Sequence, residues 1–423
     1  MKSIFSLERY YFWIIITSLF VNLTWIICIP TQPFPDFLFF HELAQQIAKG
    51  GIWGNTFYAV GYPVFLAFFY RLFGSSLLVA KSLNIVLTFV SCILFLRILK
   101  ILPLKEWTRR GAFLAFVFFP TNIYYNSIVS TEIFFTSLLL LIFNIYFSNI
   151  KYKYWLIGLL TGLMSLVKPF FPAFVLIVFL IELISQHSVL LAMKRAGIVL
   201  IICLLAITPW LYRNYKLIGE FTYISNNSGI ILYINNNSQN IRGVWMPAAD
   251  VAGSIVNKPE YQTANATQKN KMLSKAAKQW IINNPGKFMI LGFKRIDNTY
   301  FHPLGDSDFI FYGTNFSINT SPILTYIAVG LWVIVFLPGI MAILVFSFYY
   351  LYKAAKKELR TIPHAGKEAG LLLTFLMFTG IYFVTEGQTR YAFPLVFILV
   401  YFTFRTLTLG QDLLNRKLFA VRP

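Results

Sequence analysis

Six charged side chains stand at or just beyond the ends of apolar segments, where such groups need either water or a function. They are Asp36, Glu132, Lys168, Arg213, Glu386 and Arg390. A carboxylate in a partly dry site can accept a proton from a hydroxyl, which fits Asp36 and Glu132. Lysine and arginine neutralise phosphate, which fits Lys168, Arg213 and Arg390. Each residue alone could be an interfacial anchor or half of a structural ion pair. Together they predict a reaction on an anionic substrate at a membrane surface.

The composition places these residues in an integral membrane protein. Of 423 residues, 57% are hydrophobic and only 12% are charged, which is more apolar side chain than a soluble domain buries. The net charge of +20 does not indicate nucleic-acid binding, because many Lys and Arg residues lie in short loops where they set orientation and contact lipid headgroups. Cys28, Cys92 and Cys203 lie in apolar segments without metal-ligand spacing, and we expect them to pack.

Ten segments approach the length of about 20 residues that a membrane-crossing helix needs. They cover residues 10–30, 76–99, 110–127, 131–149, 155–168, 169–186, 196–213, 322–351, 368–385 and 391–409. With the N-terminus in the cytoplasm, every cytoplasmic loop is short and basic, as the positive-inside rule requires. The predicted fold class is therefore an all-α polytopic membrane protein with both termini inside.

The extracytoplasmic face contains a different kind of loop. A helical pattern over 39–49 and an apolar stretch over 61–73 predict interfacial or re-entrant helices in the first outer loop, residues 31–75. We divide the chain into a transmembrane module (1–213) that includes this catalytic loop, a long extracytoplasmic loop (214–321) and C-terminal transmembrane helices (322–423). The long loop is rich in Asn and Ser, with one helical stretch over 268–284 that ends at Asn284-Pro285-Gly286.

One further group of polar residues could be a metal site. His302, Asp306 and Asp308 are close in sequence, but their spacing matches no specific ligand pattern. We expect this cluster to be a solvated loop, and no metal ligand is assigned.

Five motifs, in order along most of the chain, resemble the integral-membrane GT-C glycosyltransferases, the group that includes the protein mannosyltransferase and lipid A aminoarabinose transferase families. They are Asp36 with HELAQQIAKG (41–50) and GYPVFLAFFYRLFG (61–74), Ser130-Thr131-Glu132, Val167-Lys168-Pro169, PWLYRN (209–214) and EGQTRYAFP (386–394). Each motif alone is weak, whereas five in sequence are fairly specific.

The resemblance implies an acid in the first outer loop, matching Asp36, as the catalytic base. It implies a polyprenyl-phosphate-linked sugar as donor, inversion at the anomeric carbon, and Lys168 and Arg213 at the donor phosphate. Arg390 and Glu386 match a motif near the same mouth. Members often carry a second acid or a tyrosine shortly after the first, where this chain has Phe40-His41-Glu42. His41, Glu42 and Tyr62 therefore stay additional site candidates, and a divalent cation stays open as a cofactor.

The leading hypothesis is a glycosyltransferase of the plasma membrane that moves a sugar from a polyprenyl phosphate to a glycan, lipid or protein acceptor on the outer side. One alternative is a lipid-linked saccharide transporter or flippase, which would place polar groups at the bilayer midplane. A second is an oligosaccharide polymerase or ligase that uses a lipid-diphosphate donor. Neither the sugar nor the acceptor can be read from the sequence.

Overall fold

The protein is all-helical over the residues that its computed structural model describes, 8–317 and 322–420, and no strand occurs in them. The first half contains α1 (Arg9–Cys28), α2 (Pro35–Ala48), α3 (Gly61–Phe73), α4 (Leu77–Ile101), α5 (Glu106–Val117), α6 (Pro120–Tyr124), α7 (Glu132–Phe147), α8 (Lys153–Ser165), α9 (Phe174–Gln186) and α10 (Val189–Ile218). The second half contains α11 (Ser228–Asn235), α12 (Pro259–Thr263), α13 (Ala266–Asn283), α14 (Pro285–Tyr300), α15 (Ser307–Ile310), α16 (Pro322–Leu331), α17 (Leu337–Ala355), α18 (Ala365–Val384) and α19 (Val396–Ala420). Short helices of other types, labelled η, lie between them. They are the 3₁₀ helices η1 (Tyr125–Ser127), η2 (Phe171–Ala173), η3 (Ala248–Asp250), η4 (Ile255–Asn257), η7 (Leu359–Thr361) and η8 (Thr389–Leu395), and the π-helix η6 (Trp332–Phe336).

Six helices in the described residues are long and apolar enough to cross a membrane, which makes this an integral membrane protein. They are α1, α4, α10, the continuous helix Pro322–Ala355, α18 and the helix Thr389–Asn415. These six coincide with six of the ten predicted spans.

The other four predicted spans correspond to shorter helices. Helix α5 has 12 residues, α7 has 16 and α8 has 13, and the fourth segment is the apolar helix Phe171–Gln186. At about 1.5 Å per residue, 16 residues reach only about 24 Å, less than a typical hydrocarbon core of about 30 Å. The sequence explains two of the breaks: Pro120 starts a new helix after α5, and Lys168-Pro169 follows α8. The count of ten spans therefore stays a prediction.

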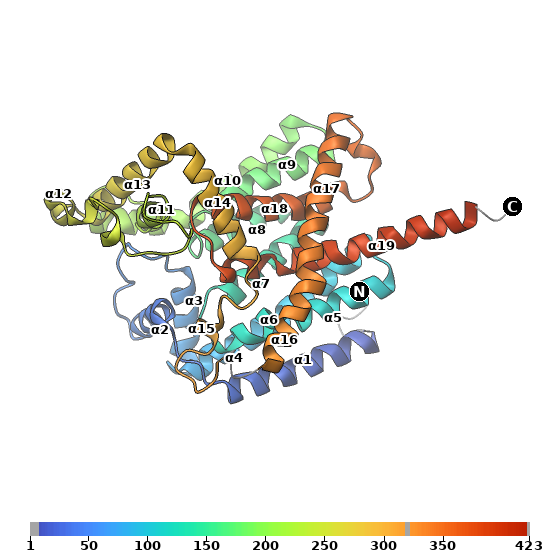
Figure 1. Cartoon of the computed structure of the whole chain (residues 1–423), viewed down its shortest axis with the longest axis horizontal. Helices are drawn as coiled ribbons and strands as arrows, with labels where there is room; N and C mark the ends of the chain where they lie inside the picture. The colour runs from blue at the N-terminus through green and yellow to red at the C-terminus, as the bar shows by residue number, and fades with distance from the viewer. Residues whose placement is uncertain (1–7, 318–321, 421–423) are drawn as a thin grey trace.

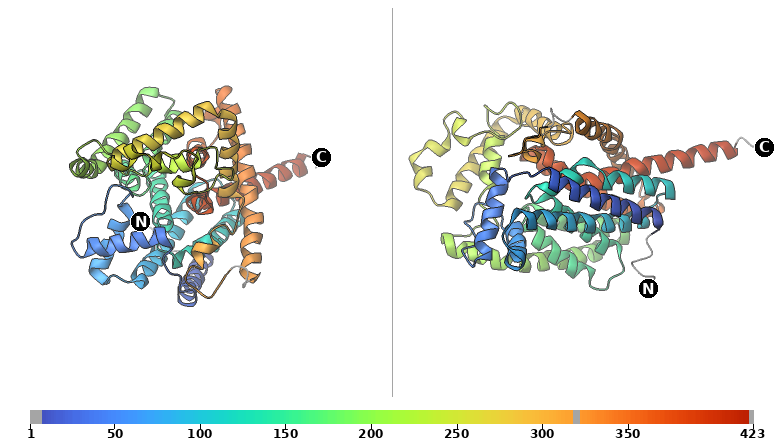
Figure 2. Two further views of the ribbon diagram at one scale, coloured as in Figure 1. Left: turned by 60° about the vertical axis from the view of Figure 1, so that its left-hand side comes forward. Right: turned by 90° about the horizontal axis from the view of Figure 1, so that it is seen from below.

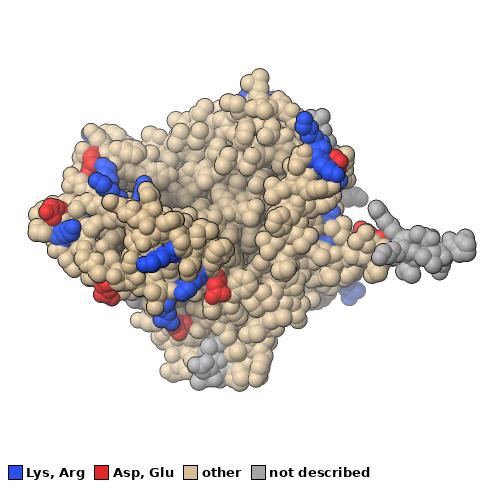
Figure 3. Space-filling model, turned by 45° about the horizontal axis from the view of Figure 1, so that its top comes forward, with Lys and Arg blue, Asp and Glu red and all other residues tan. Residues whose placement is uncertain are grey.

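Some helices follow the long axis of the molecule and others cross it (Figure 1). Helices α1, α5 and α19 run close to this axis, and α16 and α17 cross it (Figure 1, Figure 2). Helices α2, α3 and α11 to α13 gather at one end, which we call the loop end. On the face in Figure 3, charged side chains collect at the two ends and the surface between them is uncharged, as expected of a membrane-facing band.

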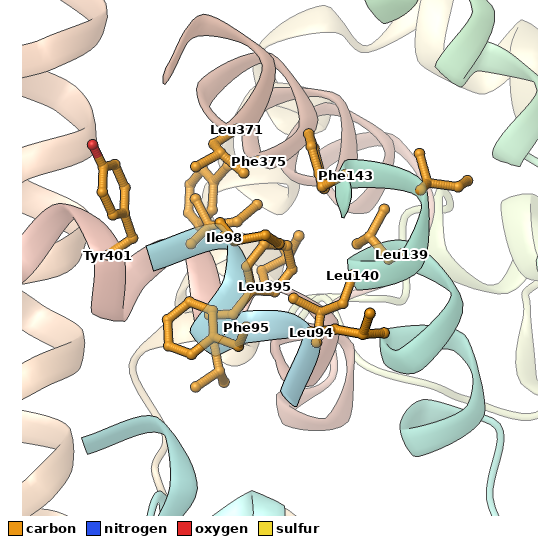
Figure 4. Packing of buried hydrophobic residues seen from close by; sticks show 14 of the residues in the cluster. Leu94, Phe95, Ile98, Leu139, Leu140, Phe143, Leu371, Phe375, Leu395 and Tyr401 are labelled. Carbon is orange, nitrogen blue, oxygen red and sulfur yellow. The ribbon is translucent and has the colours of Figure 1, made fainter. Parts of the chain in front are cut away.

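The core lies where α4, α7, α18 and η8 meet. Figure 4 shows Phe95 of α4, Phe143 of α7, Phe375 of α18 and Leu395 in one cluster, and all four side chains are almost fully buried. Helix α7 packs against α4 on one side and against η8 on another. Because Glu132 starts α7 and Arg390 lies in η8, this packing brings two charged residues that are 258 positions apart in the chain to one place.

Buried carboxylates also join the helices. Glu368 at the start of α18 accepts hydrogen bonds from the hydroxyls of Tyr350 and Tyr401 and from the guanidinium of Arg405. Glu182 of α9 is bound in the same way by Tyr146, Tyr154 and Arg195. Each network satisfies a buried charge with two hydroxyls and one arginine from neighbouring helices.

Candidate active site

Asp36 lies in the first turn of α2. Pro35 at the first helical position follows Phe34 in an extended conformation, a favourable helix start because proline has no amide hydrogen to leave unpaired. The Asp36 side chain is about half exposed (50%), and its Oδ2 lies 3.7 Å from Nη2 of Arg390. The carboxylate thus combines a cationic neighbour with access from outside.

Glu132 and Lys168 form the second ion pair of the site. Glu132 Oε1 lies 3.7 Å from Lys168 Nζ, and both side chains are largely buried. The other carboxylate oxygen, Oε2, is buried and has no hydrogen-bond partner among the described residues. The Lys168 ammonium lies over the rings of Phe135 (5.5 Å) and Tyr391 (5.7 Å). The unpaired Oε2 of Glu132 and the long 3.7 Å ion pair leave hydrogen-bonding capacity that a bound polar group could satisfy.

Arg390 lies between aromatic rings in η8. Its guanidinium is 5.5 Å from the ring centres of Phe37 and Phe309 and 5.4 Å from that of Tyr391. Its Nε is buried and unpaired among the residues that the structure describes. Glu386 accepts hydrogen bonds from Tyr391 Oη and Gln388 Nε2, both 2.8 Å long.

The Tyr391 ring connects the cluster, because it lies beside both cations while its hydroxyl binds Glu386. Five of the six predicted charged residues therefore share one site: Asp36, Glu132, Lys168, Glu386 and Arg390.

Arg213, the sixth, makes different contacts. Its guanidinium donates to the carbonyls of Trp53 (3.1 Å), Gly54 and Asn55 (3.4 Å), and it stacks over the Trp210 ring at 4.5 Å. No ion pair or hydrogen bond with the other five occurs among the described residues. Arg213 thus ties the end of α10 to the loop between α2 and α3.

The remaining candidates support α2 and α3. His41 is buried, with Nδ1 2.6 Å from Tyr70 Oη and Nε2 3.0 Å from Gln45 Nε2, so both ring nitrogens are occupied. Burial lowers the pKa of His41, which the charge of Glu42 partly opposes. Glu42 itself is exposed, and Tyr62 is buried between Phe40 and Phe134. Burial raises the pKa of Tyr62, and Glu132 adds to that rise.

The expectation of a solvated loop is wrong for Asp306. This side chain is only 4% exposed, and its Oδ2 accepts a hydrogen bond from the hydroxyl of Tyr125. Burial raises the pKa of Asp306 to about 7, against the lowering effects of Tyr125 and Arg390. The nearby Asp308 is exposed, and His302 forms an exposed pair with Asp297, 3.1 Å long. No local signal separates Asp306 from Asp308, because Tyr125 is 181 positions away.

A second residue that the sequence does not single out is Arg295 of α14. It is fully buried and donates to the carbonyls of Phe383 (2.6 Å) and Asn235 and to Oδ1 of Asn236 (2.8 Å). Through these bonds the helix pair α11 and α14 is fixed to the end of α18, directly before the Glu386 motif.

No group of three or more His, Cys, Asp or Glu side chains that could hold a metal ion occurs within the described ranges.

Close packing explains why the motif that begins at Glu386 has glycine at its second position, Gly387. A Cβ at this position would lie 2.2 Å from the carbonyl oxygen of Arg295 and 2.5 Å from its Cα, which are backbone atoms that cannot move aside cheaply. We expect Gly387→Ala to destabilise the protein by about 1–3 kcal/mol. Gly380→Ala is the control, because a Cβ there would meet nothing within 4 Å and alanine favours a helix. Thermal unfolding of the detergent-solubilised variants measures both; equal midpoints would contradict the close packing.

Comparisons of the chain with protein-family models, with curated proteins and with solved structures found no match. The chemistry of the site therefore has to be inferred from its own residues. Two largely buried cations, Lys168 and Arg390, near three carboxylates could bind a phosphate and move a proton at the same place.

Proposed function

We propose that this protein is a glycosyltransferase that takes a sugar from a polyprenyl phosphate and transfers it to an acceptor hydroxyl at the membrane surface. The observation that carries the proposal is the pairing of two largely buried cations, Lys168 and Arg390, with two acids, Asp36 and Glu132, at one site. The order of the GT-C-like motifs supports it as a resemblance. We place the reaction on the extracytoplasmic side because the basic short loops favour that orientation.

In the proposed reaction Asp36 takes the proton of the acceptor hydroxyl. The hydroxyl oxygen then attacks the anomeric carbon, and the bond between this carbon and the phosphate oxygen breaks with its electron pair leaving on the phosphate. Lys168 and Arg390 stabilise the negative charge of the departing lipid phosphate. Attack from the side opposite the phosphate inverts the anomeric carbon. Asp36 is suited to the role because it is the exposed acid of the site, whereas Glu132 is buried beside Lys168.

The phosphate-binding role of Lys168 predicts a specific loss. Lys168→Met keeps the aliphatic stem but removes the ammonium, and we expect polyprenyl phosphate to bind about 10- to 100-fold more weakly, as for the loss of a hydrogen bond to a charged group. Arg213→Ala is the comparison, because that guanidinium is already bound to backbone carbonyls. We expect it to change lipid binding less.

Native mass spectrometry with a defined polyprenyl phosphate in detergent micelles measures both affinities. If Arg213→Ala weakened binding more than Lys168→Met, the phosphate site would have to be placed at Arg213. If neither variant changed the affinity, this cation pair would not be a phosphate site.

A further inference from the structure

The end of the long loop folds into the site. The hydroxyl of Thr31 donates to the carbonyl of Ile310 (2.6 Å), and the amide of Gln32 donates to the carbonyl of Tyr312 (2.9 Å). Next to these anchors the Phe309 ring packs against Phe34 (4.8 Å) and lies below the Arg390 guanidinium. Segment 304–312, which includes α15, thus forms a wall of the site.

Asp306 is the buried acidic residue of that wall. Its carboxylate accepts a hydrogen bond from the Tyr125 hydroxyl of η1, and the charge and backbone amide of Arg390 in η8 act on it to lower its pKa. The Tyr125 ring in turn packs against Phe393, 4.9 Å between ring centres, in the same turn as Arg390. The titratable or charged groups that face Asp306 are Tyr125, the positive Arg390 and the negative Glu132.

We propose that Asp306 is a positioning residue that holds η8 so that the Arg390 guanidinium faces the donor phosphate, and that its charge sets how strongly Arg390 binds that phosphate. The identity of the ligand, a donor phosphate, rests on the proposed function. The contacts of Asp306 do not depend on it. When Asp306 is protonated, the positive charge of Arg390 is free to act on the phosphate. When Asp306 is ionised, its negative charge lies beside Arg390 and repels a second anion.

The direction of the pH effect follows from the raised pKa of Asp306, about 7 against an ordinary value of 3.8. A raised folded-state pKa stabilises the fold at low pH, and this contribution is lost as the pH rises through about 7. Asp306 becomes negatively charged over the same pH range. Because this charge lies beside Arg390, we expect phosphate binding to weaken about tenfold between about pH 6 and pH 8, a typical size for coupling between neighbouring sites.

The test uses the full-length protein and a prenyl phosphodiester, whose single charge does not change between these pH values. In wild type its affinity should fall with rising pH. Asp306→Asn, a stand-in for the protonated form, should bind nearly equally at both pH values. Asp308→Asn is the matched control, because Asp308 is exposed, and should keep the wild-type dependence.

Tyr125→Phe separates positioning from a purely structural role. The Tyr125 hydroxyl lowers the pKa of Asp306, so removing it should move the midpoint of the binding curve to higher pH while the carboxylate stays in place. A merely structural hydrogen bond would lower stability without moving this midpoint. Wild-type affinity without pH dependence, or the same dependence in Asp306→Asn, would overturn the inference.

A second readout does not need the ligand. Wild type should unfold at a lower temperature at about pH 8 than at about pH 5, and Asp306→Asn should reduce that difference. If wild type bound no phosphodiester at any pH, the proposed function would fail and the ligand part of the inference with it. An unchanged pH dependence of unfolding in Asp306→Asn would refute the inference on its own.

Discussion

Asp36→Asn should abolish sugar transfer while the protein still folds and binds the donor. Asparagine has nearly the same shape but cannot accept a proton at neutral pH, and losing a general base typically slows turnover by about 10²- to 10⁴-fold. Donor affinity should be unchanged or higher, because Arg390 loses its 3.7 Å ion pair with Asp36 and is freer to bind phosphate. The measurement is transfer from sugar-charged polyprenyl phosphate in membranes that contain equal amounts of each variant.

Glu42→Gln is the informative comparison for this result. Glu42 lies on the same helix, is exposed, and makes no ion pair within the described parts of the chain. We expect it to retain transfer within about twofold, as for an exposed acid outside the chemistry. If Asp36→Asn kept near-normal turnover and Glu42→Gln lost it, the catalytic base would be Glu42, in the second turn of α2, and not Asp36 in the first.

The largest expected change in stability concerns a different carboxylate, Glu368. Its side chain is 1% exposed and binds Arg405, which is 13% exposed, at 2.8 Å, along with the hydroxyls of Tyr350 and Tyr401. Glu368→Ala leaves a largely buried guanidinium and two hydroxyls without their acceptor, and breaking such a pair costs about 3–5 kcal/mol. Tyr401→Phe removes one donor only and should cost about 1 kcal/mol.

Glu358→Ala controls for the loss of an ion pair as such. Glu358 pairs with Lys353 at the end of α17, where its side chain is 42% exposed, and exposed pairs contribute about 0–1 kcal/mol. Thermal or denaturant unfolding in detergent compares the three variants. A Glu368→Ala protein as stable as Glu358→Ala would mean that this network does not hold α17, α18 and α19 together.

The sequence predicted the local features of the fold well where apolar pattern and helix boundaries agree. Gly61–Phe73 forms α3 with the expected bounds, and the helix expected over 268–284 is α13, which ends before Pro285. That α3 lies in the membrane interface stays a prediction. The helix after Pro285, α14, was not predicted, because its buried face is completed by Arg295 and Gly292 instead of a regular apolar stripe.

The sequence singled out part of the candidate site but not all of it, because some of its residues are brought there only by contacts between distant segments. Charged residues at span ends are visible in a sequence because they interrupt apolar segments, and five of the six meet in the structure. Asp306 lies in a polar loop, where a carboxylate is unremarkable, and its burial depends on Tyr125 and Arg390 from distant helices. Arg213 has the expected residue type at a span end, but its partners in the loop after α2 could not be foreseen.

The most direct test of the proposed glycosyltransferase is the lipid that the protein retains on purification. Wild type and Asp36→Asn would be exposed to the same cell-envelope lipids, and the bound lipids identified by mass spectrometry. We predict free polyprenyl phosphate on wild type, the product of transfer, and sugar-charged polyprenyl phosphate trapped on Asp36→Asn. A polyprenyl diphosphate on both, or the same sugar-charged lipid on both, would contradict the assignment.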